Sequence, residues 1–431
     1  MGTAELGNPT NHEADPQARL PPELLLVILH HLRFDRSALR QFCLVSRQLR
    51  SLSQPFIFEH ISVGTQAPRE IASQSPCSSL YETLCQSPHI VTYIHHVDIV
   101  SPRLGPAWIA GESTLPPLLS LLADANVVKT FRLRLSGEDW GNLPPELQHS
   151  IKLLIKSPSL RNLDFSDFVY LAADIFEHCR SVERLKFSEI IEFRADSEDR
   201  SREWLRTIKS FTLLDTDIDN WMFVFPSFHA LRDLRIAVTH DEVNPLQYLL
   251  RHVSGTLESL NLQLVISYWP KGSSSAGSIS LPSLKSLRLS VGLSKPCCDD
   301  DDVLHWAIFF LLEQHRYKTL QHLTLDLRFD DASDPHALTG KWRELDSALS
   351  DANVFSKLKT LAITLFPMYP EAEPVVRLVG DELPRLLPWT AARDGFEIVR
   401  LNRPTSSFFF WPGPLEWSEC EGEYEILEDG E

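Results

Sequence analysis

The residue types that could bind a metal ion gather in the stretch CCDDDD, residues 297–302. Vicinal cysteines lack the two-residue gap that lets both thiolates reach one zinc ion, and four consecutive aspartates do not place ligands as a calcium loop does. Acidic residues here instead favour the N-terminus of a helix that begins at Val303. The side chains of His30-His31 and of His95-His96 point in different directions, so neither pair predicts a ligand set. We therefore expect no metal ion and no other cofactor.

The chain also lacks the patterns that carry catalysis. It has no GxSxG, no HExxH and no glycine-rich phosphate loop, and it holds 17 glycines in 431 residues. Cys77 and Cys85 lie near His89 in the sequence, but adjacency in sequence does not place a thiol on a base. We expect a non-catalytic protein, so its function must come from the surfaces that its helices and strands create.

The composition narrows the class of partner. Hydrophobic residues make up 43% and charged residues 23% of the chain, as in a typical globular protein. The net charge of −17 would repel a phosphate backbone, so nucleic acid is not an expected partner. No stretch approaches the roughly 18 consecutive apolar residues of a membrane span, so no membrane is expected either. The seven cysteines are odd in number and scattered, which suits free thiols in a cytoplasmic or nuclear protein.

One short pattern recurs along most of the chain: a hexamer with apolar residues at positions i, i+3 and i+5. Examples are LRNLDF (160–165), LRDLRI (231–236) and LKSLRL (284–289), and further hexamers begin at residues 94, 128, 182, 208, 257, 320 and 358. From 160 to 284 they start 22, 26, 23, 26 and 27 residues apart. This spacing resembles that of leucine-rich repeats, whose period is about 20 to 29 residues. The intervals outside this run are 32 to 38 residues, which leaves room for longer helices or inserted loops.

Each hexamer is expected to form a short strand of a repeat that buries one face and needs its neighbours. Strand alternation then sends i+3 and i+5 into the core and i+2 and i+4 to a concave face suited to protein recognition. The predicted concave residues are Asn162, Asp164, Arg184, Lys186, Ser210, Thr212, Asp233, Arg235, Ser259, Asn261, Ser286, Arg288, His322 and Thr324. Both charge signs occur among them, so they do not predict the charge of a client.

The resemblance covers residues 90 to 370 and departs from the usual repeat at one position. Leucine-rich repeats place Asn or Cys three residues after the last apolar strand position, where the side chain satisfies backbone groups of the turn. Here that position holds Phe168, Ile190, Thr216, Thr239, Val265, Gly292, Arg328 and Phe366. The repeats are therefore degenerate.

A helical period precedes the repeats. Pro21, Pro22 and Glu23 predict a helix start, because proline is tolerated in the first turn and an acidic residue there meets the positive end of the helix dipole. Leu24 and Ile28 then begin an apolar face with a spacing of four residues, continued by Leu32.

Two further helices are expected in this module. Asp35 is placed to cap the second helix and Ser46 the third, and Pro55 is expected to end the third. A module of this length falls below the size of about 40 residues at which a domain usually stands on its own core. Its apolar faces therefore require a partner, which is either another protein or the N-terminal end of the repeats.

The segment that begins LPPELLLVILHHL and continues DRSALRQFCLVSRQLRSLSQPFIFEHI resembles the F-box. The positions that match the family pattern are Leu20, Pro21, Glu23, Leu24, Leu25, Ile28, Leu32, Leu39, Val45, Ser46, Arg47 and Leu49. A phenylalanine, Phe56 or Phe58, stands where many members have tryptophan. In that family the motif binds a Skp-family adaptor and, through it, cullin and RING subunits, while C-terminal repeats hold a protein substrate for ubiquitin transfer. The resemblance implies adaptor binding by Leu20, Pro21, Glu23, Leu24, Leu25, Ile28, Leu32, Leu39, Val45 and Leu49.

The expected fold class is α/β, with a small three-helix F-box followed by an irregular leucine-rich-repeat horseshoe of short parallel strands. The expected divisions are a disordered tail (1–18), the F-box (19–61), a connector (62–89), the degenerate repeats (90–407), and an aromatic cap with an acidic tail (408–431). This order resembles that of fungal-type F-box proteins with leucine-rich repeats. The implied function is substrate recognition in an SCF-type cullin-RING ubiquitin ligase. The alternative is an F-box scaffold without a role in ubiquitination.

Overall fold

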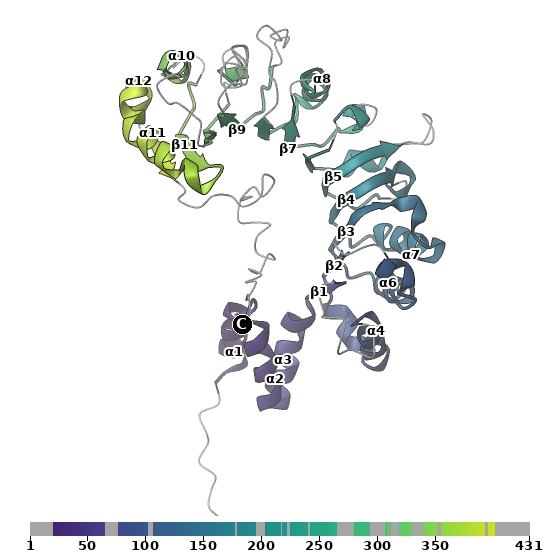
Figure 1. Ribbon diagram of the computed structural model, residues 1–431. Coiled ribbons are helices and arrows are strands. Elements are labelled where there is room, and N and C mark those ends of the chain that lie inside the picture. Colours follow the sequence, from purple (N-terminus) through teal and green to yellow (C-terminus); the bar gives the residue numbers. More distant parts are fainter. Residues whose placement is uncertain are drawn as a thin grey trace, which may run out of the picture. The chain divides into compact units, whose positions relative to one another are not determined.

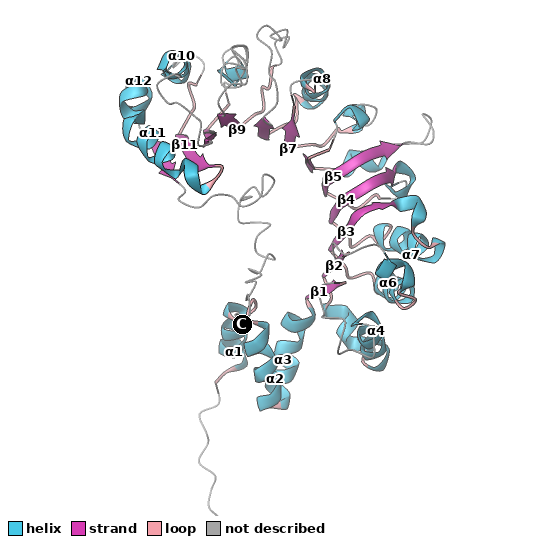
Figure 2. Ribbon diagram, viewed as in Figure 1, coloured by secondary structure: helices cyan, strands magenta, loops and turns pink. Residues whose placement is uncertain are grey.

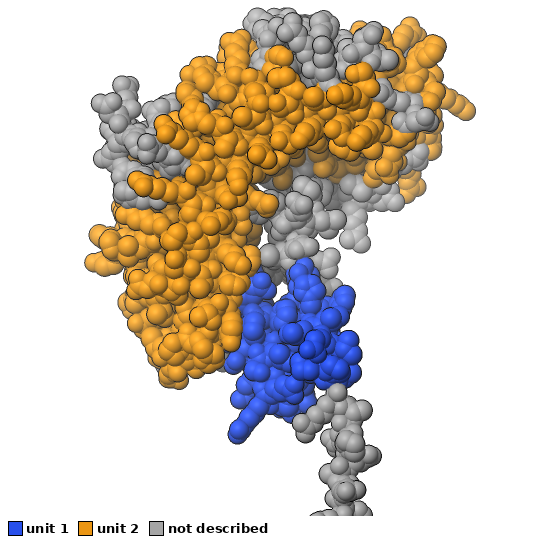
Figure 3. All heavy atoms as spheres, turned by 180° about the vertical axis from the view of Figure 1, so that it is seen from behind, with its two compact units in different colours: residues 1–60 blue, residues 61–431 orange. Residues whose placement is uncertain are grey.

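The computed structural model divides the chain into two compact units, residues 1–60 and 61–431 (Figure 3). The structure describes residues 20–64, 76–101, 107–176, 179–194, 203–216, 218–221, 225–239, 242–264, 280–293, 307–308, 310–311, 319–329, 339–350, 355–392 and 395–400. The expected tail (1–18), the CCDDDD stretch (297–302) and the expected cap and acidic tail (408–431) lie outside the described residues.

The first unit contains three helices, α1 (Pro22–His31), α2 (Arg36–Val45) and α3 (Arg47–Phe58). The two predicted caps are confirmed. The Asp35 carboxylate accepts a hydrogen bond from the Ala38 amide at 2.8 Å, and the Ser46 hydroxyl accepts one from the Leu49 amide at 3.1 Å. The prediction that Pro55 ends the third helix is wrong, because α3 continues to Phe58. Proline removes one helical hydrogen bond, and the packing of α3 on α1 and α2 maintains the helix past it.

The second unit is built on a sheet of twelve strands in chain order, and every neighbouring pair from β2 to β12 is parallel. The strands are β1 (His60–Val63), β2 (His96–Val100), β3 (Thr130–Asp139), β4 (Asn162–Ala172), β5 (Arg184–Arg194), β6 (Ser210–Leu214), β7 (Asp233–Val238), β8 (Ser259–Leu264), β9 (Ser286–Leu293), β10 (His322–Phe329), β11 (Thr360–Pro367) and β12 (Phe396–Arg400).

Helices and 3₁₀ turns connect the strands. The helices are α4 (Pro76–Gln86), α5 (Ala107–Gly111), α6 (Leu115–Ala125), α7 (Pro145–Ile155), α8 (Val243–Val253), α10 (Thr339–Ser350), α11 (Glu373–Leu386) and α12 (Pro388–Ala391). The 3₁₀ turns are η1 (Pro88–Tyr93), η2 (Trp140–Asn142), η3 (Ala173–Phe176), η4 (Glu203–Thr207), η5 (Ile218–Trp221), η6 (Phe225–Ser227) and η7 (Pro370–Ala372). Within this unit the strands line the inner side of an arc and the helices lie on its outer side (Figures 1 and 2). The architecture is a parallel-strand solenoid consistent with leucine-rich repeats.

All ten predicted hexamers are confirmed as strands, and each strand begins two residues after the first residue of its hexamer. The longer intervals contain longer helices, as expected: α6, α7 and α10 lie in intervals of 34, 32 and 38 residues. The sequence analysis missed β1 and β12. The hexamer FEHISV (58–63) has the repeat pattern but had been assigned to the helical module, and the hexamer of β12 has Arg393 at its first position.

The core lies between the sheet and its helices. Side chains at i+3 and i+5 are buried, as predicted; Leu163 and Phe165 of β4 are both 0% exposed. Aromatic rings continue this layer through neighbouring repeats, with 6.2 Å between the ring centroids of Phe165 and Phe187 and 4.3 Å between those of Phe187 and Trp221. Each such pair contributes roughly 0.5–1.5 kcal/mol beyond the burial of its area. The sheet is therefore a firm base for the polar residues on its other face.

Two polar side chains take over the turn function of the missing Asn or Cys. The Thr216 hydroxyl accepts a hydrogen bond from the Ile190 amide of the preceding repeat at 3.1 Å and donates one to the Leu214 carbonyl at 3.0 Å. In the next repeat the Glu242 carboxylate accepts from the amides of Ile218 and Thr239 at 2.9 and 2.6 Å. The repeats are degenerate in sequence at this position, but these turns have their backbone groups satisfied.

The segment 62–89, which we expected as a connector, carries part of the second unit. Its described part contains the end of β1, the helix α4 and the start of η1. Cys77 and Leu84, two turns apart in α4, are 1% and 0% exposed. Their burial fixes the helix to the unit, and the sequence pattern missed it because the buried side is narrow and lies among serines and threonines.

Candidate functional site

The first unit has an unusually apolar surface. Eight of the thirteen large hydrophobic residues that are exposed in the described part of the chain lie between residues 20 and 45. They are Leu20, Leu24, Leu26, Val27, Ile28, Phe34, Leu44 and Val45, and their exposures range from 39% to 80%. Scattered exposed hydrophobic residues are ordinary, but a concentration of them in one small unit marks an interaction surface.

The structure places the ten predicted adaptor-binding residues in three environments. Leu20, Pro21, Glu23, Leu24, Ile28 and Val45 are exposed, Leu25, Leu32 and Leu49 are half-buried, and Leu39 is buried. Leu39 and Leu29 supply the buried hydrophobic side chains among the described residues of this unit, so Leu39 supports the surface from below. The sequence reasoning missed Val27 and Leu44. The helical spacing of Val27 from Leu24 could have indicated it.

Arginines surround this surface. Arg33, Arg36, Arg40, Arg47 and Arg50 stand against the single acid Asp35 between residues 30 and 50. Hydrogen bonds to carbonyl groups hold two of the guanidinium groups, since Arg36 donates to His60 at 2.9 Å and Arg50 to Cys43 at 3.3 Å. The unit therefore has the apolar and basic character that suits an acidic partner with an apolar contact surface.

The concave face of the sheet carries charge in layers. In one row across β2 to β5, Arg132 lies between Asp98 and Asp164, at N–O distances of 3.5 and 3.1 Å, and Lys186 lies 3.2 Å from Asp164. The two carboxylate side chains are 12% and 4% exposed, whereas the cations are 19% and 27% exposed. The sequence showed a mixture of signs. The structure adds that the anions of this row lie deeper than the cations.

Three acidic residues follow one another at the C-terminal ends of β4 to β6. Asp167, Glu189 and Asp215 each lie seven residues after the start of their hexamer, and all have a left-handed backbone, with φ of 66°, 56° and 51°. Burial raises the pKa of Asp215 to about 7; the negative charge of Glu189 acts in the same direction and Arg328 in the opposite one. This edge of the sheet is therefore sensitive to pH near neutrality.

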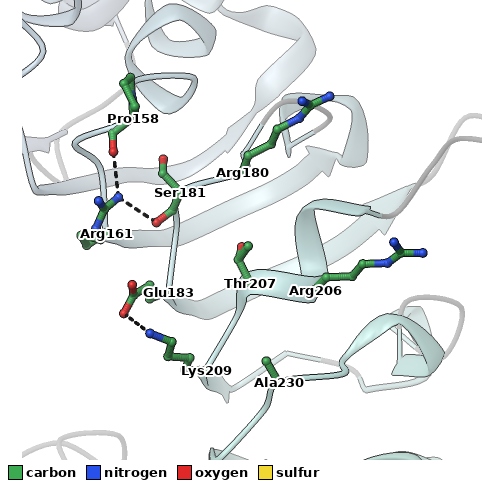
Figure 4. Close-up of a pocket in the computed structure, with 9 residues that line it drawn as sticks. All are labelled: Pro158, Arg161, Arg180, Ser181, Glu183, Arg206, Thr207, Lys209 and Ala230. Carbon is green, nitrogen blue, oxygen red and sulfur yellow. Dashed lines mark hydrogen bonds and ion pairs between the residues drawn. The ribbon is translucent and has the colours of Figure 1, made fainter.

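A hollow of about 440 Å³ lies at the opposite edge, where the chain enters β4, β5 and β6. We call it the edge groove, and its lining residues are Pro158, Arg161, Arg180, Ser181, Glu183, Arg206, Thr207, Lys209 and Ala230. Equivalent positions of adjacent repeats line up in it (Figure 4). Arg161, Glu183 and Lys209 form one side, Arg180 and Arg206 the other, and Ser181 and Thr207 lie between them.

The backbone ladder fixes the first side of the groove. The Glu183 amide donates to the Arg161 carbonyl and the Lys209 amide to the Glu183 carbonyl, both at 2.8 Å. One nitrogen of the Arg161 guanidinium, Nη1, donates to the carbonyls of Pro158, Leu160 and Ser181 at 2.8, 3.2 and 3.1 Å. Lys209 pairs with Glu183 at 2.9 Å. Within the described residues, neither Arg161 nor Arg180 forms an ion pair.

The structure brings together no set of metal ligands among the residues it describes, since no three His, Cys, Asp or Glu side chains there are grouped to hold an ion. In the same residues, none of the helices has the length and apolarity needed to cross a membrane.

Comparisons with known proteins add little to this geometry. No family model matches the chain, and no curated protein sequence matches it. A solved structure that is similar to it is an internalin (inlF) from Listeria monocytogenes, with 11% sequence identity, 87% of this chain and 92% of the internalin chain covered, and a TM-score of 0.32. A likeness this distant carries no functional argument, so the interpretation depends on the chain's own surfaces.

Proposed function

We propose that the protein is a non-catalytic substrate-recognition subunit of an SCF-type cullin-RING ubiquitin ligase. The first unit would bind a Skp-family adaptor, which connects to cullin and RING subunits, and the repeats would bind a protein client. The observation that carries the proposal is the exposed apolar surface of residues 20–45 on a unit with a very small core of its own. The F-box resemblance of the same residues names the adaptor class.

The physical reason for expecting a partner is the cost of this surface in water. Burial of apolar area contributes about 25 cal/mol per Å², and Leu24, Leu44 and Val45 are 50%, 80% and 72% exposed. An adaptor that covers these side chains removes that area from water. The surrounding arginines would speed its encounter with an acidic adaptor.

The mechanism would be positioning. A subunit that holds its client near the ubiquitin carrier raises the effective concentration of the reacting groups and needs no catalytic residue of its own. The long parallel sheet supports the coarser part of this function, because stacked repeats give an extended protein-binding surface.

Co-purification of the full chain with a Skp-family adaptor tests the proposal. The variant combines Leu20→Ala, Pro21→Ala and Leu24→Ala, all at exposed positions, and is expected to lose the adaptor while retaining its helix content. The matched control combines Val169→Ala, Ile191→Ala and Leu378→Ala, which are exposed apolar positions of the second unit. Undiminished adaptor binding by the first variant would count decisively against the proposal.

A proteome comparison separates the ligase from a scaffold that binds the adaptor without directing ubiquitination. Clients of a ligase subunit accumulate both when the gene is deleted and when the proteasome is inhibited. An unchanged proteome after deletion would favour the scaffold.

A further inference from the structure

We propose that the edge groove binds an acidic segment of a partner protein. Carboxylates of that segment would be held by the guanidinium groups of Arg161, Arg180 and Arg206. The inference goes beyond the adaptor and concerns a different surface from the concave face, so it stands or falls separately from the proposed ligase role.

The charge of the groove is the first argument. Four cations and one acid line it, and the acid, Glu183, is already paired with Lys209 at 2.9 Å. This positive excess occurs in a chain whose net charge is −17. The groove is also part of a longer basic row. The residues at position i+1 of the hexamers form a continuous backbone ladder, in which the charged members are Lys129, Arg161, Glu183, Lys209, Arg232, Glu258, Lys285 and Lys359.

Preorganisation is the second argument. Three carbonyl contacts hold Arg161 in place through one nitrogen, which leaves its other N–H groups to bind a carboxylate without further ordering. The hydroxyl groups between the two sides are already used, since Ser181 donates to the Ser157 carbonyl and Thr207 to the Val182 carbonyl, at 2.8 and 2.9 Å. The contacts to a ligand must therefore come from the cations, which selects for negative charge.

The repeat geometry favours a segment that crosses several repeats. Arg180 and Arg206 occupy the same position, two residues before the hexamer, in adjacent repeats. Neighbouring strands are about 4.8 Å apart, so the sheet presents successive cations at a spacing that carboxylates along an extended peptide can follow.

A protein segment fits the groove better than other anions. The hollow of about 440 Å³ has room for several side chains, more than one phosphate ion fills. A long nucleic acid would be repelled by the net charge of −17 and would meet Glu183 and Glu258 along the basic row. A peptide can alternate acidic with neutral residues and so avoid both acids.

The test measures binding of a synthetic peptide of alternating glutamate and alanine to the full chain at low salt. The peptide is expected to bind, with an affinity that falls as salt is added. The double variant Arg180→Gln and Arg206→Gln is expected to lower the affinity about tenfold or more, because it removes charge-assisted contacts. Both side chains are exposed, so the variant should keep its unfolding midpoint.

The matched control removes the same charge elsewhere, by Arg251→Gln and Arg343→Gln at exposed positions of α8 and α10. It is expected to bind like the unmodified chain. An equal loss in the control, equal binding of a peptide with glutamine in place of glutamate, displacement by equimolar inorganic phosphate, or tighter binding of a single-stranded RNA of equal charge would each overturn the proposal.

One more variant distinguishes a partner from the chain's own acidic end. Eight acids lie between residues 416 and 431, and changing all of them to their amides tests whether they occupy the groove. Similar peptide binding by this variant and by the unmodified chain supports a partner protein. Peptide binding that appears only in the amide variant would assign the groove to the chain's own end and overturn the proposal.

Discussion

Arg288 of β9 and Asp326 of β10 form a two-point ion pair on the concave face. Nε lies 2.6 Å from Oδ2 and Nη2 lies 3.2 Å from Oδ1, and the Asp326 side chain is 0% exposed. The register partner of Arg288 is Thr324, so the guanidinium reaches diagonally to the deeper residue. Burial raises the pKa of Asp326, and the hydrogen bond and positive charge of Arg288 act against this rise. The arginine is therefore what makes a carboxylate tolerable at this depth.

Replacing Arg288 with methionine should lower the free energy of unfolding by about 2 kcal/mol. The change strands the Asp326 carboxylate in the sheet, and breaking a fully buried pair costs roughly 3–5 kcal/mol. The expected loss is smaller because the Arg288 side chain is 26% exposed. Urea denaturation of the full chain measures it.

The control for this prediction is the double variant Arg288→Met with Asp326→Leu. Removing both partners leaves no stranded charge, so most of the lost stability should return. A double variant as unstable as the single one would show that packing, and not the ion pair, governs this site.

Replacing Asp215 with asparagine should remove a pH dependence of stability. The pKa of Asp215 is about 7 in the folded chain, against 3.8 for the unperturbed group. Its stabilising contribution is therefore full below pH about 4 and is lost as the pH rises through about 7. The variant should match the parent near pH 4 and be more stable at pH 8 by about 1 kcal/mol, a value reduced because solvent still reaches the carboxyl.

Denaturation midpoints of both proteins across this pH range test the prediction. Asparagine tolerates the left-handed backbone at residue 215, where φ is 51°, so the substitution adds no strain. Glu189→Gln is a partial control, because it removes the neighbouring negative charge that raises the pKa of Asp215. A stability difference that does not change with pH would contradict the assignment.

Replacing Thr216 with valine should cost about 1–3 kcal/mol of unfolding free energy. The hydroxyl accepts the hydrogen bond of the buried Ile190 amide, and a methyl group of similar size leaves that donor without a partner. Faster hydrogen exchange at the Ile190 amide would locate the effect. Thr216→Ser keeps the hydroxyl and should retain most of the stability and the protection.

The sequence predicted the strands well because one buried face imposes a pattern on each repeat. Leu163 and Phe165 had to be apolar, and so did their equivalents, which made ten strands legible. Polar positions carry no such constraint. Asp164 and Asp233 both alternate to the concave face, but Asp164 is buried and Asp233 is exposed, because depth depends on neighbouring strands. The edge groove was invisible for the same reason, since Arg180 and Arg206 meet only through the register of the sheet.

Replacing Leu44 with alanine should weaken adaptor binding in the proposed complex about tenfold. Leu44 is 80% exposed at the end of α2, next to Val45 at 72%, so it supports little of the unit's own core but offers the most accessible apolar side chain of its surface. Losing its contact area in a complex should cost about 1.4 kcal/mol, which is tenfold in affinity.

A binding titration with the purified adaptor measures the effect of Leu44→Ala, and Leu378→Ala provides the matched control. Leu378 is 43% exposed on α11 of the second unit, so its loss should leave adaptor binding unchanged. Equal affinities of the two variants would show that the adaptor does not contact the end of α2. The docking surface would then have to be narrowed to α1, where Leu24 and Val27 are exposed on one helical face.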